Sequence, residues 1–423
     1  MNPYRVREEM NGIEDPEGKV WFWDLASSVI DADRCIQCGT CVAVCPSNSI
    51  GVRASNGLPE LVKMCTGCSL CWDFCPRGGL RYEALSPAGT APVGAGVAAV
   101  VTGPVGAVAG APAGGEERSA ADALGPVDVY AAVRASTRLG HVQDGGAVTA
   151  ILCALLERDV IDGAVVTAAS RDPLDPKKGV AKVATTREEI LAAAGSFYNQ
   201  TMALAALDLS SCKLPPQPRL AVVGTPCVVQ GARAMQTRRW RTGAHRVDAV
   251  VLTIALMCSK NFEYEALMRR ELRDRRGVDL ERVQKVDVIR GRLIVEYTDG
   301  EVAVDESIKS FHDAALAGCD ECADFSGQAA DISVGSVGSI DGWTSILVRT
   351  ARGRRAFDAA RAALDVKDLD DVDALIRLSR ADSRRAASAM QRPLDPTGAL
   401  FISHADHVQH YSGTARQPVV LRR

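Results

Sequence analysis

The spacing of apolar residues divides the chain into segments of different secondary structure. From about residue 126 onward, short apolar runs bounded by turn residues alternate with segments in which apolar residues recur at helical spacing. The predicted strands are 126–134, 163–167, 220–224 and 247–256, and helices are predicted at 150–156, from 186–190 and after Pro226. Strands that alternate with helices predict an α/β domain with helices around a sheet.

Two further patterns extend this larger domain. Short strand-like runs between 283 and 304, with turns at Arg290-Gly291 and Asp299-Gly300, predict a β-hairpin addition. The segment 351–390 is rich in Ala, Arg and Asp at helical spacing, which predicts a helical surface element. We therefore expect the α/β domain over 126–350 and a helical C-terminal tail over 351–423.

The first part of the chain is organised by a cysteine repeat. The pattern C-x2-C-x2-C-x3-C-P occurs twice, thirty residues apart. Three thiolates at two-residue gaps can hold three corners of an iron-sulfur cube, and the fourth lies too far along to close the same cube, so it reaches the other one. The two predicted 4Fe-4S ligand sets are Cys35, Cys38, Cys41 and Cys75 for one cluster and Cys65, Cys68, Cys71 and Cys45 for the other.

The prolines after each repeat turn the chain away from the ligand, because proline fixes φ and lacks an N–H. A structural zinc site typically uses two CxxC pairs separated by a spacer, and a disulfide framework belongs to small secreted chains. Neither pattern matches this repeat. Residues 1–85 are therefore a predicted α+β ferredoxin-like domain with two clusters.

Composition limits the cellular compartment and the classes of partner that we expect for the protein. Fourteen cysteines and a charged N-terminal sequence without a secretory apolar core indicate a reducing, cytoplasmic location. The net charge of −3, with both signs interspersed, offers no basic stripe for nucleic acid. Residues 86–125 form an Ala/Gly/Pro-rich linker, and the uncharged stretch 86–115 contains four prolines and no Leu, Ile or Phe, so we expect no membrane span.

Four cysteines outside the repeat form a second candidate metal set. Cys227 and Cys258 each follow a predicted strand, at the end where open α/β sheets place their ligands. The pair Cys319 and Cys322 forms a CxxC motif further along. Four thiolates suit either zinc or a third 4Fe-4S cluster, and the spacing does not separate these two. Cys153 and Cys212 have no evident partner motif.

Glycines mark a second kind of site. Gly145 and Gly146 stand where a strand passes into a helix, and paired glycines there free backbone N–H groups to meet an anion such as a cofactor phosphate. Paired glycines also simply begin many helices, so both interpretations stay open.

Several motifs together resemble the coenzyme F420 hydrogenase/dehydrogenase beta subunit family, over about residues 126–350, with a ferredoxin-like module fused in front. They are Gln143-Asp-Gly-Gly-Ala-Val-Thr149, Ile161-Asp-Gly-Ala164, Ala194-Gly-Ser-Phe-Tyr198, Gly224-Thr-Pro-Cys227, and Cys319-Asp-Glu-Cys-Ala-Asp-Phe325 leading into Ala330-Asp-Ile-Ser-Val-Gly335. Phe197 stands where many relatives carry lysine.

The resemblance implies FAD bound on the α/β domain and coenzyme F420 as the substrate over the flavin. It also implies a third 4Fe-4S cluster held by Cys227, Cys258, Cys319 and Cys322. The implied flavin or deazaflavin contacts are Gly145, Gly146, Thr149, Gly195, Ser196, Tyr198, Thr225 and Asp331.

The expected function is that of an iron-sulfur flavoprotein oxidoreductase. A flavin accepts a hydride and releases electrons singly, so hydride exchange with coenzyme F420 can be coupled to electron transfer through clusters to ferredoxin or a partner subunit. The sequence leaves the direction open. A ferredoxin-dependent reductase of a chlorophyll-type substrate and a non-catalytic electron-transfer subunit are the alternatives, and oligomerisation stays open. The scattered histidines form no hydrolytic constellation, and catalytic residues are not assigned.

Overall fold

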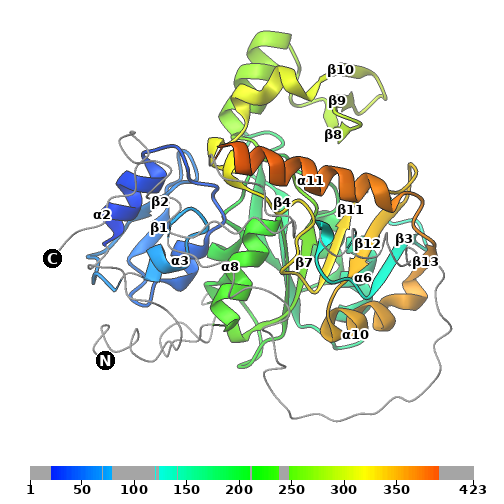
Figure 1. The fold of residues 1–423 in the computed structure, drawn as a ribbon, viewed down its shortest axis with the longest axis horizontal. Coiled ribbons are helices and arrows are strands. Elements are labelled where there is room, and N and C mark those ends of the chain that lie inside the picture. The colour runs from blue at the N-terminus through cyan, green and yellow to red at the C-terminus, as the bar shows by residue number, and fades with distance from the viewer. Residues whose placement is uncertain are drawn as a thin grey trace.

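The computed structural model describes residues 21–68, 70–78, 120, 123–140, 142–209, 212–237 and 247–389. Figure 1 shows a small N-terminal module beside a larger α/β body, with a third, smaller lobe next to α11. The predicted fold class is confirmed, because a ferredoxin-like module precedes an α/β domain with helices around a sheet. Residues 86–119, 121 and 122 of the predicted linker 86–125, and the end of the predicted tail from 390, lie outside the described residues.

The N-terminal module is built from short elements around the cysteine repeat. Its helices are α2 Phe22–Leu25, η1 Ala26–Ile30, α3 Thr40–Val44 and α4 Leu70–Asp73, and its antiparallel hairpin pairs β1 Ile50–Val52 with β2 Pro59–Leu61. Val44, Trp72 and Phe74 are at most 1% exposed and form the module core. Trp21 covers Gly67, where a Cβ would lie 2.9 Å from the indole. The residues that precede the first cysteine repeat therefore pack on the cluster module.

The larger body is built on an eight-stranded mixed sheet with the order β13-β3-β12-β11-β7-β6-β4-β5. Strands β4, β6, β7 and β11 are parallel neighbours, and β5, β12 and β13 pair antiparallel with theirs. The bounds are β3 Val129–Ala135, β4 Gly163–Ala169, β5 Gly179–Ala184, β6 Leu220–Gly224, β7 Val250–Leu256, β11 Ile332–Gly335, β12 Thr344–Val348 and β13 Leu364–Lys367.

Alternation along the strands gives the sheet two buried faces. Val165 and Val222 share a core with the cluster module, whereas their neighbours Val166 and Val223 share a core with α6 and α10. The helices of the body are α6 Ala147–Glu157, α7 Arg187–Ala192, η4 Ala203–Leu207, α8 Pro226–Thr237, α10 Ala351–Ala360, η9 Arg361–Ala363 and α11 Val372–Ala389. One face of the sheet is thus committed to holding the module.

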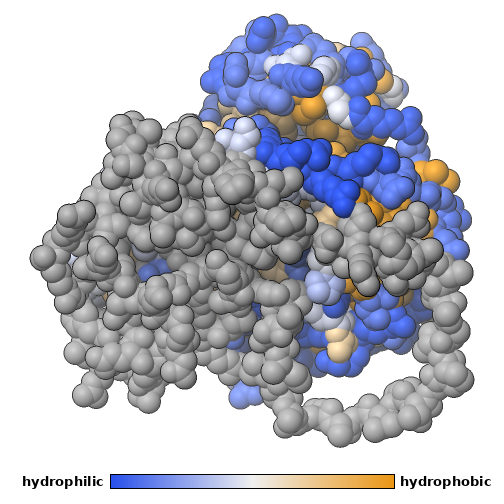
Figure 2. All heavy atoms as spheres, in the orientation of Figure 1, coloured by the Kyte–Doolittle hydropathy of each residue, from blue (hydrophilic) through white to orange (hydrophobic). Residues whose placement is uncertain are grey.

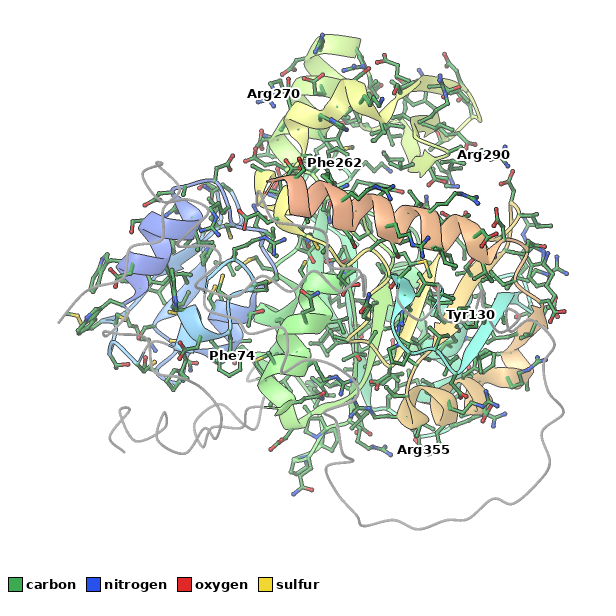
Figure 3. All side chains as sticks on the ribbon, viewed as in Figure 1. Phe74, Tyr130, Phe262, Arg270, Arg290 and Arg355 are labelled. Atoms are coloured by element: carbon green, nitrogen blue, oxygen red, sulfur yellow. The ribbon has the colours of Figure 1, made fainter. Side chains whose placement is uncertain are left out.

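The predicted hairpin addition is confirmed as a three-stranded antiparallel sheet of β8 Val283–Ile289, β9 Arg292–Tyr297 and β10 Val302–Ser307. It has its own apolar core with η6 Glu265–Asp274 and η7 Ile308–Ala314. Figure 2 shows it as a separate lobe beside the hydrophilic outer surface of α11. Phe262 lies at its junction with the body, and Arg270 and Arg290 lie on its outer parts (Figure 3).

Two expected boundaries differ in the structure. The tail 351–423 was expected to be helical, but β13 adds a strand that pairs with β3, so residues 351–389 complete the α/β domain. Ala120, Ala123 and Leu124 fall in the expected linker, yet they are at most 4% exposed and pack in a core with Leu375 of α11. The structure of both segments depends on packing against residues far away in the chain, which local composition does not encode.

The module docks on the body through close backbone contacts. The N–H of Met202 donates to the Gln37 carbonyl at 3.1 Å, and the N–H of Leu204 donates to the Cys38 carbonyl at 3.3 Å. Gly39 has φ +85° and lies so near Met202 that a Cβ would be 2.7 Å from its carbonyl oxygen. Glycine there permits the close approach.

The α11 helix faces the body with one apolar stripe. Leu375, Ile376 and Ala386 are buried, and the spacing of these residues matches one helical face. Within the part of the chain that the structure describes, none of the helices has the length and apolar character needed to cross a membrane.

The docking contact can be tested at Gly318, in η8 Ala317–Glu321. A Cβ at this residue would overlap the backbone carbonyl oxygen of Arg34, which cannot move without shifting the cluster loop. We expect Gly318→Ala to destabilise the protein by about 1–3 kcal/mol, because overpacking a tight contact displaces backbone. Thermal unfolding of the cluster-loaded protein measures the loss.

The matched control is Gly51→Ala in β1 of the module. The atoms nearest to its Cβ would be those of the Val62 side chain, which is 57% exposed and can rotate away. A Gly318→Ala variant as stable as Gly51→Ala would contradict the close docking of the module.

Candidate metal centres and cofactor site

Two cavities in the N-terminal module are each lined by four cysteines. One, which is partly open to solvent and offers about 360 Å³ of free space, is lined by Cys35, Cys38, Cys41 and Cys75, among apolar residues and Arg77. The other, also partly open, offers about 290 Å³ and is lined by Cys45, Cys65, Cys68 and Cys71. Each cavity takes three cysteines from one repeat and the fourth from the other. This is the ligand arrangement that a crossed pair of 4Fe-4S clusters requires.

The electrostatic environment groups the thiols in the same way. Burial raises the pKa of Cys41 well above its usual value, and the charges that add to this effect include those of Cys38, Cys35 and Cys75. Burial likewise raises the pKa of Cys71, together with the charges of Cys68, Cys65 and Cys45. Thiols in such places ionise when a bound metal supplies the compensating positive charge, so the donors fit iron-sulfur clusters.

Backbone amides face several of these sulfurs. The N–H of Ser49 donates to Cys45 Sγ at 3.2 Å, and the N–H of Gly67 donates to Cys65 Sγ at 3.4 Å. The N–H of Arg77 donates to Cys75 Sγ at 3.4 Å. Hydrogen bonds to cluster sulfurs stabilise the anionic ligand and tune the reduction potential.

The structure also brings the second cysteine set together. Cys227 opens α8 after β6, Cys258 follows β7, Cys319 lies in η8 and Cys322 follows η8. Burial and the charges of Cys319, Cys227 and Cys322 raise the pKa of Cys258. Cys227 and Cys258 therefore follow the ends of strands, as predicted. Among the described residues, no three histidine, cysteine or acidic side chains form a site for a single metal ion.

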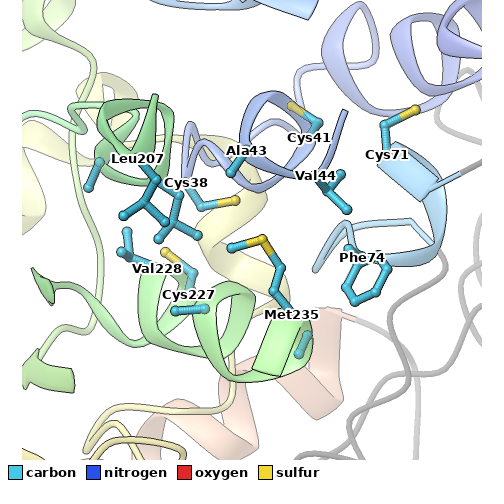
Figure 4. Close-up of a cluster of buried hydrophobic side chains, with 14 of the residues drawn as sticks. Cys38, Cys41, Ala43, Val44, Cys71, Phe74, Leu207, Cys227, Val228 and Met235 are labelled. Carbon is cyan, nitrogen blue, oxygen red and sulfur yellow. The ribbon is translucent and has the colours of Figure 1, made fainter. Parts of the chain in front are cut away.

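The three cysteine sets follow one another in space. Burial raises the pKa of Cys227, and among the charges that add to this effect the charge of Cys38 of the first set comes ahead of those of Cys322 and Cys319. At the other side of the first set, the charge of Cys71 acts on Cys41. Figure 4 shows Cys227 and Cys38 within one buried cluster, with Cys41 and Cys71 farther along. The first set thus lies between the other two.

A buried ion pair joins the first and the third set. Arg34 Nε donates to Glu321 Oε1 at 2.9 Å and its Nη2 donates to Oε2 at 3.1 Å, with side chains 0% and 1% exposed. Arg77 lies 3.8 Å from the same carboxylate and donates from Nε to the Gly318 carbonyl at 2.6 Å. Sequence reasoning missed this group, although each residue lies within two positions of a predicted cysteine ligand.

The α11 helix secures the loops that carry Cys258 and Cys322. Arg385 donates from Nη2 to the Ser259 carbonyl at 2.9 Å and lies 3.8 Å from Asp320. Lys260 pairs with Asp320 at 2.6 Å, and Ser383 Oγ donates to the Ala323 carbonyl at 3.4 Å. The predicted tail therefore covers the third cysteine set.

Some of the predicted cofactor residues gather where α6 begins. Gly146 adopts φ +67° at the N-cap, and the Gly145 carbonyl accepts from the N–H of Ala135 at the end of β3. Thr149 lies one turn into α6 and is 8% exposed. The paired glycines therefore place the α6 N-terminus at the carboxyl end of the sheet, which is where α/β folds bind phosphate groups.

The predicted loop 195–198 reaches the three-stranded lobe. Gly195 adopts φ +112°, Ser196 is exposed, and Tyr198 donates its hydroxyl to Asp287 Oδ1 at 3.2 Å while accepting from the N–H of Val288 at 3.1 Å. The Tyr198 hydroxyl therefore ties this loop to β8.

Asp144, between Gln143 and Gly145, lies near the same strand. Burial, with the charge of Asp287 adding to it, raises the pKa of Asp144 to about 6, and Lys285 opposes the shift. Gln143 Nε2 donates to the Val286 carbonyl at 3.3 Å, and Lys285 pairs with Asp287 at 2.8 Å. The structure thus brings the 143–146 loop and Tyr198 together at β8. No sequence pattern pointed to Lys285 or Asp287.

Thr225 takes a different place. Its Oγ1 lies 3.1 Å from Cys227 Sγ and accepts from Gln200 Nε2 at 3.2 Å. Gln200, two residues after Tyr198, also donates from Nε2 to Cys227 Sγ at 3.5 Å. Thr225 and Gln200 therefore connect the predicted flavin loop to the third cysteine set.

Asp331 does not fit the expected cofactor contact. Its side chain is 0% exposed and accepts from the backbone N–H of Thr253 at 2.9 Å, from Arg233 at 3.1 Å and from Thr350 at 2.7 Å. Arg352 completes the group, donating from Nε to both oxygens at 3.1 Å. Asp331 instead joins β7, β11, α8 and α10 as a buried structural carboxylate.

Phe197 packs into the body of the domain. A Cβ at Gly179 of β5 would lie 2.6 Å from the Phe197 Cβ and 2.7 Å from the Thr167 side chain. The aromatic ring therefore sits against the sheet edge in the place where relatives were expected to present a lysine charge.

Three family models match the chain. They are described as the coenzyme F420 hydrogenase/dehydrogenase beta subunit N-terminus, over residues 129–208, the C-terminus of the same subunit, over 218–372, and a 4Fe-4S dicluster domain, over 28–81. The first two together cover the sheet, the three-stranded lobe and the second cysteine set. The third covers both cysteine repeats.

Individual proteins agree. An uncharacterized protein of Methanocaldococcus jannaschii is 30% identical over 85% of this chain and 97% of its own length. The coenzyme F420 hydrogenase subunit beta of Methanococcus voltae is 34% identical over 55% of this chain and 81% of its own. A chain in a xenon-derivatized structure of the F420-reducing [NiFe] hydrogenase complex from Methanosarcina barkeri superposes with a TM-score of 0.58 at 29% identity, covering 64% of this chain and 93% of that one.

The crossed ligation predicts which cysteines act together. We expect Cys35→Ser and Cys75→Ser to remove the same electron paramagnetic resonance signal, and Cys65→Ser to remove a different one, because Cys75 lines the cavity of the first set. Each change should lower the iron content by about four atoms per chain.

The control is Cys212→Ser, because Cys212 belongs to no set and should leave iron and spectra unchanged. If Cys75→Ser instead gave the spectrum of Cys65→Ser, the ligation would be uncrossed.

Proposed function

The chain belongs to the coenzyme F420 hydrogenase/dehydrogenase beta subunit family, and on that basis we propose that it is an iron-sulfur flavoprotein that exchanges electrons between coenzyme F420 and a one-electron protein carrier. Its family and its N-terminal cluster module make the chain an oxidoreductase-type subunit with a 4Fe-4S domain. The observation that carries the proposal is the row of three cysteine sets, which begins at the predicted cofactor loops and ends at the outer side of the module.

The proposed FAD site lies at the loop 143–146, whose Gln143 side chain donates to β8, and at Tyr198, whose hydroxyl also bonds to β8. The N–H groups at the start of α6 would hold the phosphates, because a helix N-terminus carries partial positive charge. When bound, FAD would accept a hydride and release electrons singly, and the clusters would carry single electrons. Gln200 and Thr225, which contact each other and Cys227, connect this loop to the third set.

The third set is proposed to hold a 4Fe-4S cluster rather than zinc. Cys227 lies in one buried apolar group with Cys38, so a redox centre there would continue the row of the module. Burial of Cys38, Cys41, Cys71 and Cys227 keeps water from the path. The cysteine content is in keeping with a reducing, cytoplasmic location.

The first test is anaerobic. We expect the purified chain to contain about twelve irons and one flavin, and its visible absorbance to bleach on addition of reduced coenzyme F420. Iron, sulfide and flavin assays with stopped-flow absorbance measure this.

The outcomes separate the alternatives. About eight irons with bound zinc would reduce the third set to a structural site. Full clusters and flavin without bleaching would contradict coenzyme F420 as the substrate and would point to a reductase that receives electrons from ferredoxin.

The second set is the outlet of the proposed path. Cys65 and Cys68 are half-buried, as are Cys35 and Cys75 of the first set, so the exposure of the ligands alone does not distinguish the two sets. Next to Cys65, Met64 is 81% exposed and Val62 57% exposed. We propose that an iron-sulfur protein of the ferredoxin type docks there, because single-electron exchange needs the partner's centre close to this cluster.

The outlet predicts a selective defect. Met64→Glu should slow electron transfer to ferredoxin at least several-fold, because a charge next to Cys65 disturbs an apolar contact, and should leave bleaching by reduced coenzyme F420 unchanged. Stopped-flow absorbance with and without ferredoxin measures both rates.

Val302→Glu is the matched control, since Val302 is also apolar and 55% exposed but lies on β10 of the separate lobe. Equal ferredoxin rates in both variants would place the outlet elsewhere.

A further inference from the structure

The buried group Arg34, Glu321 and Arg77 lies between two of the proposed clusters. Arg34 directly precedes Cys35, and Arg77 is two residues after Cys75, so both arginines flank ligands of the first set. Glu321 stands between Cys319 and Cys322 of the third set. The bidentate contact of Arg34 with Glu321 and the 3.8 Å approach of Arg77 hold the three charges in fixed positions.

Arg77 lies beside both sets. Its backbone N–H donates to Cys75 Sγ at 3.4 Å, and its Nε donates at 2.6 Å to the carbonyl of Gly318, the residue before Cys319. Arg77 thus contacts a ligand of the first set and the backbone next to a ligand of the third.

These charges are not screened by solvent. The side chains of Arg34, Glu321 and Arg77 are at most 2% exposed, so mobile ions do not reach them. In such surroundings a single charge acts strongly on a neighbouring redox centre. A positive charge favours the reduced, more negative form of a cluster and a negative charge disfavours it.

We propose that Arg77 and Glu321 are tuning residues that set the reduction potentials of the first and third clusters together, while the second cluster is governed by its own surroundings. This inference rests on the proposed function, because it requires clusters in both cysteine sets. Glu321 and Arg77 then have opposite effects on the same two potentials, and the ion pair keeps those potentials matched for exchange between the clusters.

A charge series tests this in the full-length, cluster-loaded protein. Redox titration followed by electron paramagnetic resonance gives the potential of each cluster. We expect Glu321→Gln to shift the first and third clusters to higher potential and Arg77→Gln to shift them to lower potential, with the second cluster unmoved. Arg77→Lys keeps the charge and should restore potentials near those of the unchanged protein.

The control is Arg53→Gln, in the exposed pair of Arg53 with Glu60 in the same module, whose side chains are 44% and 37% exposed. It should move no potential, because solvent screens that pair. A purely structural clamp would make Glu321→Gln and Arg77→Gln act alike, by loss of cluster signals or of thermal stability without shifts of opposite sign.

Different results would overturn the proposed third cluster and the proposed tuning by Arg77 and Glu321. Iron near eight atoms per chain with zinc in the third set would overturn the proposed cluster there, and with it the joint tuning. Three intact clusters whose potentials stay fixed in Arg77→Gln would overturn the tuning alone. If Glu321→Gln does not fold, the comparison of Arg77→Gln with Arg77→Lys decides the question.

Discussion

The architecture depends on one buried ion pair between segments far apart in the chain. Arg34 and Glu321 are separated by 287 residues, yet they meet in a bidentate contact with almost no exposure. Removing one partner of such a pair typically costs about 3–5 kcal/mol, because the other charge stays buried without compensation. The pair holds the loops of Cys35 and Cys319 together, so the module and the α/β domain present their cysteines as one continuous arrangement.

The sheet supplies the second half of this arrangement. The carboxyl ends of its parallel strands lie on the same side, where β6 leads to Cys227 and β7 leads to Cys258, and the 143–146 loop follows β3. One face of the sheet packs on the module, and the other packs on α6 and α10. The cofactor loop and the third cysteine set therefore lie at the same end of the sheet. The module lies next to them because it packs on an apolar face of that sheet.

Local sequence patterns predicted much of this fold and of the site. The cysteine spacing predicted which four cysteines line each cavity of the module, and apolar runs located β4, β6 and β7 closely, because spacing and periodicity are local properties. The burial of Ala120 and Leu124, the pairing of β13 with β3 and the Arg34–Glu321 contact all arise between distant segments. Asp331 matched a family motif, but its burial among arginines, visible only in three dimensions, gives it a structural role.

The proposed electron path requires three clusters in a row, with the Cys35 set in the middle. Anomalous diffraction at the iron absorption edge, from crystals grown without oxygen, would locate the clusters. Three iron peaks are expected: one among Cys227, Cys258, Cys319 and Cys322, one among Cys35, Cys38, Cys41 and Cys75, and one among Cys45, Cys65, Cys68 and Cys71. Two iron peaks, or a zinc-edge peak at the Cys227 set, would contradict the proposed path.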